Sequence, residues 1–117
     1  MTGAQIEAYL RKRVRAVGGQ TWKWTGRAGE PDRVVILPGG HVVFVEVKGQ
    51  GDRLSALQDY THRTIRALGA EVCVVWSKED VDRLLERFCP SKNERGMKRN
   101  GYERERGAGN SEGTQAV

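Results

Sequence analysis

The sequence predicts an α/β fold in which one mixed β-sheet is flanked by helices. Three features indicate this fold: capped segments with apolar residues at helical spacing, two β-branched runs joined by a glycine-rich turn, and a short apolar run between two capped segments. They give the order helix, three strands, helix, strand, helix, which favours helices packed on the faces of one sheet. A chain of 117 residues has room for one domain with one modest core.

The first expected element is a helix over residues 3–17. Thr2 and Gln5 match a capping box at its start, and two glycines after Val17 offer a stop. The apolar residues in between recur at helical spacing: Ile6, Leu10, Val14 and Val17.

Three strands should follow. Residues 20–25 alternate tryptophan with polar residues, so Trp22 and Trp24 share one face of a strand, and at least one of them is expected in the core. The runs 33–37 and 41–48 are rich in valine and flank a Pro-Gly-Gly segment, which has the chemistry of a hairpin turn.

Two further helices and a strand complete the expected domain. Ser55 can cap a helix that ends near Leu68, and the apolar run at 71–76 is short enough for a buried strand. Ser77 can cap a last helix, which a Cys-Pro pair ends. Residues 91–117 contain few large apolar side chains, so we expect a flexible basic tail there.

Composition excludes several classes of protein. No apolar run reaches the roughly 18 residues of a membrane span, and no signal peptide is evident, so we expect a cytoplasmic protein of a bacterial or phage-infected cell. The two cysteines lack metal-ligand spacing, which argues against a structural zinc site. A net charge of +5 favours a polyanionic partner, but charge alone is weak evidence for nucleic-acid binding.

The expected hairpin brings three polar side chains together. If its loop has three residues, Asp32 lies opposite Glu46, and both carboxylates share one face of the sheet. Lys48 follows Glu46 by two residues and points to the same face. A shift of one residue in loop length would place the two carboxylates on opposite faces, so the site depends on the register.

Two carboxylates at this separation need a compensating charge. Opposed β-carbons lie roughly 5 Å apart, and two like charges there repel by about 3 kcal/mol at an effective dielectric of about 20. A divalent cation bound by Asp32 and Glu46 removes the repulsion, and Lys48 beside it can act on a water or a phosphate. Taken separately, Glu46 and Lys48 are typical of a solvent-exposed strand face, and Asp32 is typical of a turn. Their position opposite each other in one hairpin favours a metal-binding catalytic site instead.

These residues resemble the VRR-NUC family of the PD-(D/E)xK nuclease superfamily. The matching segments are GEPDR, the glycine turn, VEVKGQGDRLSALQ, the first helix and the later valine-rich strand, over about residues 6–82. The resemblance implies a restriction-endonuclease-like fold, with a nuclease domain over 1–90. It also implies that Asp32, Glu46 and the backbone carbonyl of Val47 bind the metal and that Lys48 is catalytic.

Two more residues match acidic and amide positions of the family. Gln58 can reach the active face or complete an S-x-x-Q capping box with Ser55, and both roles stay open. Glu7, on the first helix, can act in catalysis by holding a metal-bound water or a second cation, or it can serve only the helix dipole. Candidates for binding DNA phosphates are Lys12, Arg27, Arg33 and Arg53, with a solvated face as the alternative for the helical member. We expect no role for His41 and His62, because neither has a partner at metal-ligand spacing.

The expected function is Mg²⁺- or Mn²⁺-dependent cleavage of DNA. The resemblance implies selectivity for branched substrates such as Holliday junctions, in replication, recombination or repair. A two-fold homodimer is expected because a four-way junction needs two paired cuts. The alternatives are a non-catalytic basic DNA-binding module of the same fold, which would show no metal dependence, and an RNA-processing endonuclease, which a substrate panel would separate.

Overall fold

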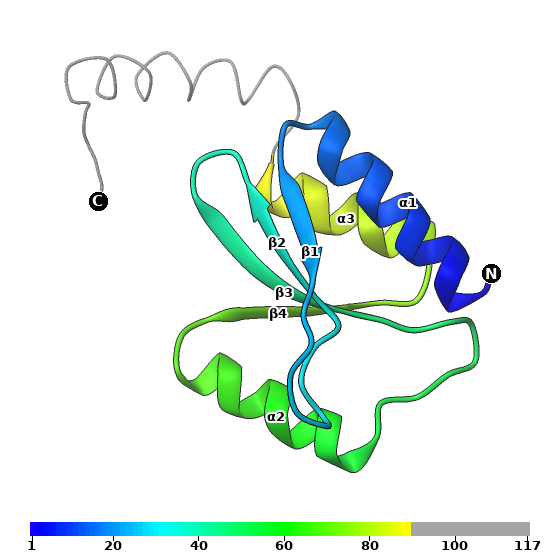
Figure 1. Cartoon of the computed structure of the whole chain (residues 1–117), viewed down its shortest axis with the longest axis vertical. Helices are drawn as coiled ribbons and strands as arrows, with labels where there is room; N and C mark the ends of the chain where they lie inside the picture. Colours follow the sequence, from blue (N-terminus) through cyan, green and yellow to red (C-terminus); the bar gives the residue numbers. More distant parts are fainter. Residues whose placement is uncertain (90–117) are drawn as a thin grey trace.

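The computed structural model describes residues 1–89 and shows one four-stranded sheet with three helices around it (Figure 1). Strands β1, β2 and β3 are antiparallel neighbours, and β4 joins parallel to β3. The expected mixed sheet flanked by helices is therefore confirmed. The elements are α1 (Gly3–Ala16), β1 (Gln20–Lys23), β2 (Arg33–Leu37), β3 (His41–Val47), α2 (Ala56–Ala67), β4 (Glu71–Val75) and α3 (Lys78–Phe88).

Capping side chains start the helices where the sequence predicts. In α1 the Thr2 hydroxyl accepts from the Gln5 backbone N–H, and the Gln5 side chain accepts from the Thr2 N–H, at 3.2 and 2.9 Å. Ser55 and Gln58 form the same reciprocal pair at the start of α2. Ser77 caps α3. Such caps satisfy backbone donors that a helix leaves open, typically worth about 1 kcal/mol each.

The β2–β3 hairpin has the three-residue loop on which the site depends. Leu37 pairs with His41 and Arg33 pairs with Val45, so the register is the one expected. Gly39 and Gly40 both have positive φ, at 94° and 83°, a conformation that a residue with a β-carbon rarely adopts. Local turn chemistry therefore places the two strands in the register that opposes the carboxylates.

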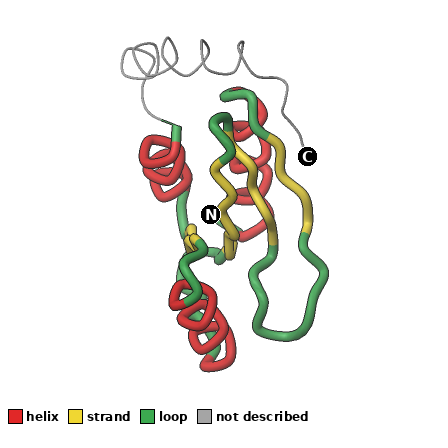
Figure 2. Tube along the Cα trace, turned by 90° about the vertical axis from the view of Figure 1, so that its left-hand side faces the viewer, coloured by secondary structure: helices red, strands yellow, loops and turns green. Residues whose placement is uncertain are grey.

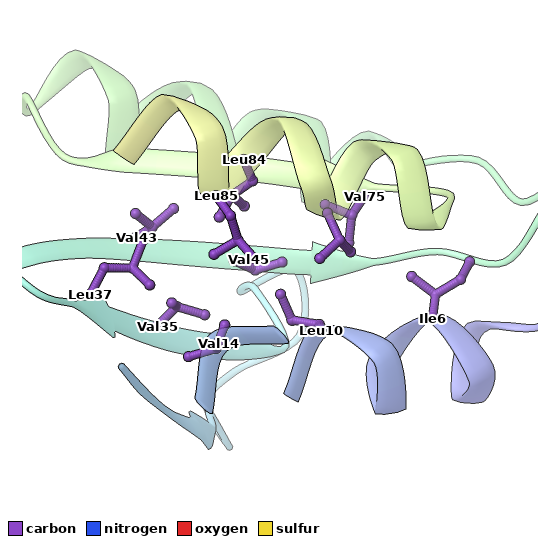
Figure 3. Close-up of a cluster of buried hydrophobic side chains, with 11 residues drawn as sticks. Ile6, Leu10, Val14, Val35, Leu37, Val43, Val45, Val75, Leu84 and Leu85 are labelled. Carbon is purple, nitrogen blue, oxygen red and sulfur yellow. The ribbon is translucent and has the colours of Figure 1, made fainter. Parts of the chain in front are cut away.

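One face of the sheet forms the hydrophobic core. Helices α1 and α3 pack against each other and against this face, and Figure 3 shows their apolar side chains meeting those of the strands. Strand residues at alternate positions point into the core, as the period of two requires. The buried members are Ile6, Leu10, Val14, Val35, Leu37, Val43, Val45, Val75, Val81, Leu84 and Leu85.

The opposite face is covered only in part. Helix α2 packs near β4, while the outer faces of β1 and β2 have no helix above them among residues 1–89. Trp22 and Trp24 are therefore 51% and 45% exposed, and the expectation that at least one lies in the core is wrong. Trp24 instead packs edge-on against Phe44, with ring centroids 5.8 Å apart. Among the described elements, α2 is the helix on this side, and it lies too close to β4 to cover both tryptophans.

The strand ends differ slightly from those expected. β1 ends at Lys23, although the Trp24 N–H still donates to the Asp32 carbonyl at 2.7 Å before the chain leaves the sheet. The loop that follows extends beyond the strands toward the end of the molecule where α2 lies (Figures 1 and 2). The expected tail at 91–117 lies outside the described residues. Within residues 1–89, no helix is both long and apolar enough to cross a membrane.

Candidate active site

Asp32 and Glu46 face each other where the hairpin strands meet the loops. Asp32 precedes β2, and the pairing of Arg33 with Val45 sets it across from Glu46. One oxygen of Asp32, Oδ2, accepts a hydrogen bond from the Val47 backbone N–H at 3.0 Å. The backbone of β3 thus fixes the Asp32 carboxylate beside Glu46, on the sheet face that α2 covers.

The pKa of the Glu46 carboxyl is shifted strongly by its surroundings. Its side chain is 2% exposed, and burial, reinforced by the negative charge of Asp32, raises its pKa to about 7 against a usual 4.5. Lys48 opposes this shift only weakly. Among the described residues, Glu46 Oε1 has no hydrogen-bond partner. A buried, unpartnered carboxylate oxygen next to a second carboxylate fits a hard divalent cation, which prefers oxygen ligands.

Lys48 completes the polar group on this face. Its Nζ lies 3.9 Å from Glu46 Oε2, and its side chain is mostly buried. The Lys48 backbone N–H donates to the Val75 carbonyl at 2.9 Å, which continues the β3–β4 pairing one residue past β3. The lysine is therefore held at the strand end, with its ammonium beside the Glu46 carboxylate.

Gln58 has both of the roles that its position leaves open. Its Oε1 accepts from the Ser55 N–H at 2.9 Å, which closes the capping box of α2. Its Nε2 donates to Glu46 Oε2 at 3.0 Å. One amide thus fixes the start of α2 and binds the buried carboxylate, so the helix cap and the site share a side chain.

His62 belongs to this group, although no role is expected for it from the sequence. Its side chain is fully buried, with Nε2 3.7 Å from Glu46 Oε1. Burial is the main cause that lowers its pKa. The signal that could have found it is its spacing: His62 lies four residues after Gln58, and residues four apart share one face of a helix.

Glu7 does not join the two opposed carboxylates. Its Oε2 is 2.6 Å from Arg33 Nη1 and 3.7 Å from Lys23 Nζ. Across residues 1–89, no three His, Cys, Asp or Glu side chains are arranged to hold a metal ion. The structure thus pairs Glu7 with cations, while metal binding by Glu7 and by the Val47 carbonyl stays a prediction.

The four basic candidates for DNA contacts have different surroundings. Arg33 is buried, with its guanidinium on Glu7 and on the Thr21 hydroxyl, which is the geometry of a structural ion pair. Arg27 is 93% exposed on its side chain, while Lys12 and Arg53 are exposed. A phosphate can reach these three without breaking a buried contact. Their role in binding DNA stays a prediction.

Glu30 and Gly29 hold the loop that leads into Asp32. Glu30 accepts from the Trp24 indole and the Arg27 backbone N–H, both at 3.0 Å, and the Trp24 hydrogen bond is the first cause that lowers its pKa. Gly29 has a φ of 90°, and a β-carbon there would lie 2.5 Å from Leu57 Cγ on α2. Glycine therefore lets the loop approach α2 closely, because a β-carbon here would be strained and would have to displace Leu57.

The chain is similar to known proteins that are described as a nuclease or as a nuclease-family domain. No protein-family model matches the chain. It is 41% identical over 76 residues to a protein of Acyrthosiphon pisum secondary endosymbiont phage 1, described as "Putative nuclease p44", and the match covers 63% of the chain and 82% of that protein. A solved structure described as "VRR_NUC domain" is similar, with a TM-score of 0.64, 37% identity, and coverage of 74% of the chain and 97% of the solved one.

Proposed function

Because the chain belongs to the VRR-NUC family of nucleases, we propose that it is a deoxyribonuclease that requires Mg²⁺ or Mn²⁺. One observation carries the proposal: the buried carboxylate of Glu46 lies opposite Asp32 and 3.9 Å from the Lys48 ammonium, and one of its oxygens has no hydrogen-bond partner among residues 1–89. A divalent cation best neutralises the two carboxylates of Asp32 and Glu46, and such a cation also binds the phosphate of a phosphodiester substrate.

Asp32 and Glu46 would hold the cation, and Lys48 would act on the substrate. When bound, the cation would supply positive charge at the scissile phosphate and lower the pKa of a water. As an ammonium, Lys48 would orient the attacking water and offset the charge that develops on the phosphate; as a neutral amine it would instead take a proton from that water. Asp32 is held by the Val47 N–H and Glu46 by the Gln58 amide, so both ligands keep their positions without substrate.

A cleavage assay tests this function directly. Linear, flap, splayed and four-way DNA, with a matched RNA panel, would be incubated with Mg²⁺, Mn²⁺ or EDTA. We expect cleavage of DNA that EDTA abolishes and that Lys48→Ala lacks. Binding of DNA without cleavage by the wild-type protein would favour a non-catalytic binding module, and preferential cleavage of RNA would favour an RNA-processing enzyme.

We further propose that the enzyme is selective for branched DNA and that it acts as a homodimer. One domain with one site cuts one strand, whereas a symmetric four-way junction needs two cuts. The uncovered part of the sheet offers apolar side chains that a second copy could bury, since Trp22, Ile36 and Val42 are each more than a third exposed. The cytoplasm of a bacterial or phage-infected cell is the proposed location, in keeping with the phage origin of the similar protein.

Sedimentation at micromolar concentration tests the assembly. We expect a dimer in the wild-type protein and a shift toward monomer in Val42→Lys, which places a charge on the uncovered sheet face. A monomer with undiminished cleavage of four-way junctions would count against the homodimer and would favour flaps or other substrates that need one cut.

A further inference from the structure

His62 is a polar side chain in a fully buried position. Its exposed fraction is 0%, and neither ring nitrogen has a hydrogen-bond partner among residues 1–89. Leaving a buried donor or acceptor unsatisfied typically costs about 1–3 kcal/mol, so an apolar side chain of similar size would stabilise the fold more. A buried histidine without a hydrogen-bond partner therefore suggests that its ring interacts with a functional group nearby.

The facing atom is also unsatisfied. His62 Nε2 lies 3.7 Å from Glu46 Oε1, and this oxygen has no partner among the residues that the structure describes. The separation is slightly beyond hydrogen-bond range, and a small rotation of either side chain would close it. Hydrogen bonds in nuclease and other enzyme sites are often long without ligand and tighten when the site is filled.

Helix α2 presents two donors to one carboxylate. Gln58 and His62 are four residues apart and lie on the same face of the helix. Gln58 Nε2 donates to Oε2 of Glu46, and His62 faces Oε1. Two donors from one rigid helix would fix the plane of the carboxylate, and each oxygen would keep a further lone pair for a cation.

We propose that His62 is a positioning residue for Glu46, donating its Nε2–H to Oε1 and thereby holding the carboxylate in the orientation that binds the divalent cation. The inference rests on the proposed function, because it takes Glu46 as a metal ligand. Donors behind a ligand typically change metal affinity by about 10- to 100-fold. His62 does not touch the substrate in this arrangement and acts only through Glu46.

Two substitutions and a matched control separate hydrogen bonding from packing. His62→Leu keeps an apolar volume without a donor, whereas His62→Gln keeps an amide donor near the place of Nε2. Val72→Ala is the control, since Val72 is buried on the sheet face that carries Glu46 and has no polar side chain. Calorimetric titration with Mn²⁺ and steady-state cleavage of DNA would be measured for all four proteins.

We expect His62→Leu to weaken Mn²⁺ binding about 10-fold and to lower kcat, with KM for DNA little changed. His62→Gln should recover most of the Mn²⁺ affinity, and Val72→Ala should lower thermal stability while binding Mn²⁺ as the wild type does. Wild-type affinity in His62→Leu would overturn the inference, and so would equal losses in the Leu and Gln variants.

The wild-type protein provides a second measurement that does not depend on the variants folding. With Mg²⁺ bound, nitrogen chemical shifts of the His62 ring should show the proton on Nε2. A proton on Nδ1 would overturn the inference. Failure of the wild-type protein to bind Mn²⁺ or Mg²⁺ would instead refute the proposed function, so the two failures are distinguishable.

Discussion

Replacing Glu46 by glutamine should stabilise the protein in metal-free buffer, and the gain should grow with pH. The substitution keeps the shape of the side chain and an oxygen that can accept from the Gln58 amide. It removes the charge that burial and Asp32 disfavour. The expected effect is therefore a higher free energy of unfolding in a protein that lacks one carboxylate of the proposed metal site.

The magnitude follows from the pKa of Glu46. The fold raises it from 4.5 to about 7, and one pKa unit corresponds to about 1.4 kcal/mol. The unfolded chain releases the proton first, so the wild-type protein loses stability as pH rises between these two values, by about 3 kcal/mol in total. Below pH 4.5 Glu46 is protonated in both the folded and the unfolded protein, and above pH 7 the full loss of stability is present.

Urea unfolding in EDTA, at several pH values between about 5 and 8, measures this difference. The Glu46→Gln protein should exceed the wild type by about 1 kcal/mol at the acidic end and by about 3 kcal/mol at the alkaline end. Added Mn²⁺ should stabilise only the wild type. A difference that stays constant across this pH range would refute the reasoning.

Three other predictions concern the same domain. Asp32→Asn should abolish metal-dependent cleavage and raise stability in EDTA, because it removes one of two repelling charges. Lys48→Ala should still bind Mn²⁺ in calorimetry but fail to cleave DNA. An active Asp32→Asn protein with normal metal affinity would contradict the proposed site. Gly29→Ala should destabilise the fold by about 1–3 kcal/mol and impair cleavage, because its β-carbon would meet Leu57 and its φ is positive, and an unchanged thermal melt would exclude this. Deleting 91–117 should leave the melting temperature and basal cleavage unchanged, because every described element ends by Phe88, and a large drop in either would count against it.

Much of the fold was predictable because its signals are local. The capping boxes at Thr2 and Ser55 each involve residues three apart, and the Pro-Gly-Gly turn sets the hairpin register through its own backbone geometry. Once that register is set, the alternation of a strand places Asp32 opposite Glu46. Even the contact between Gln58 and Glu46 was within reach of the sequence, through the resemblance.

The sequence by itself thus determined the elements, the hairpin register and the opposed carboxylates, because each depends on neighbours along the chain. Only the tertiary structure decided how distant elements meet. It paired Glu7 with Arg33, left Trp22 exposed on a part of the sheet that no helix within residues 1–89 covers, and buried His62 against Glu46. Those outcomes depend on where each helix crosses the sheet, which is set by packing of the whole core and has no signature in a local pattern.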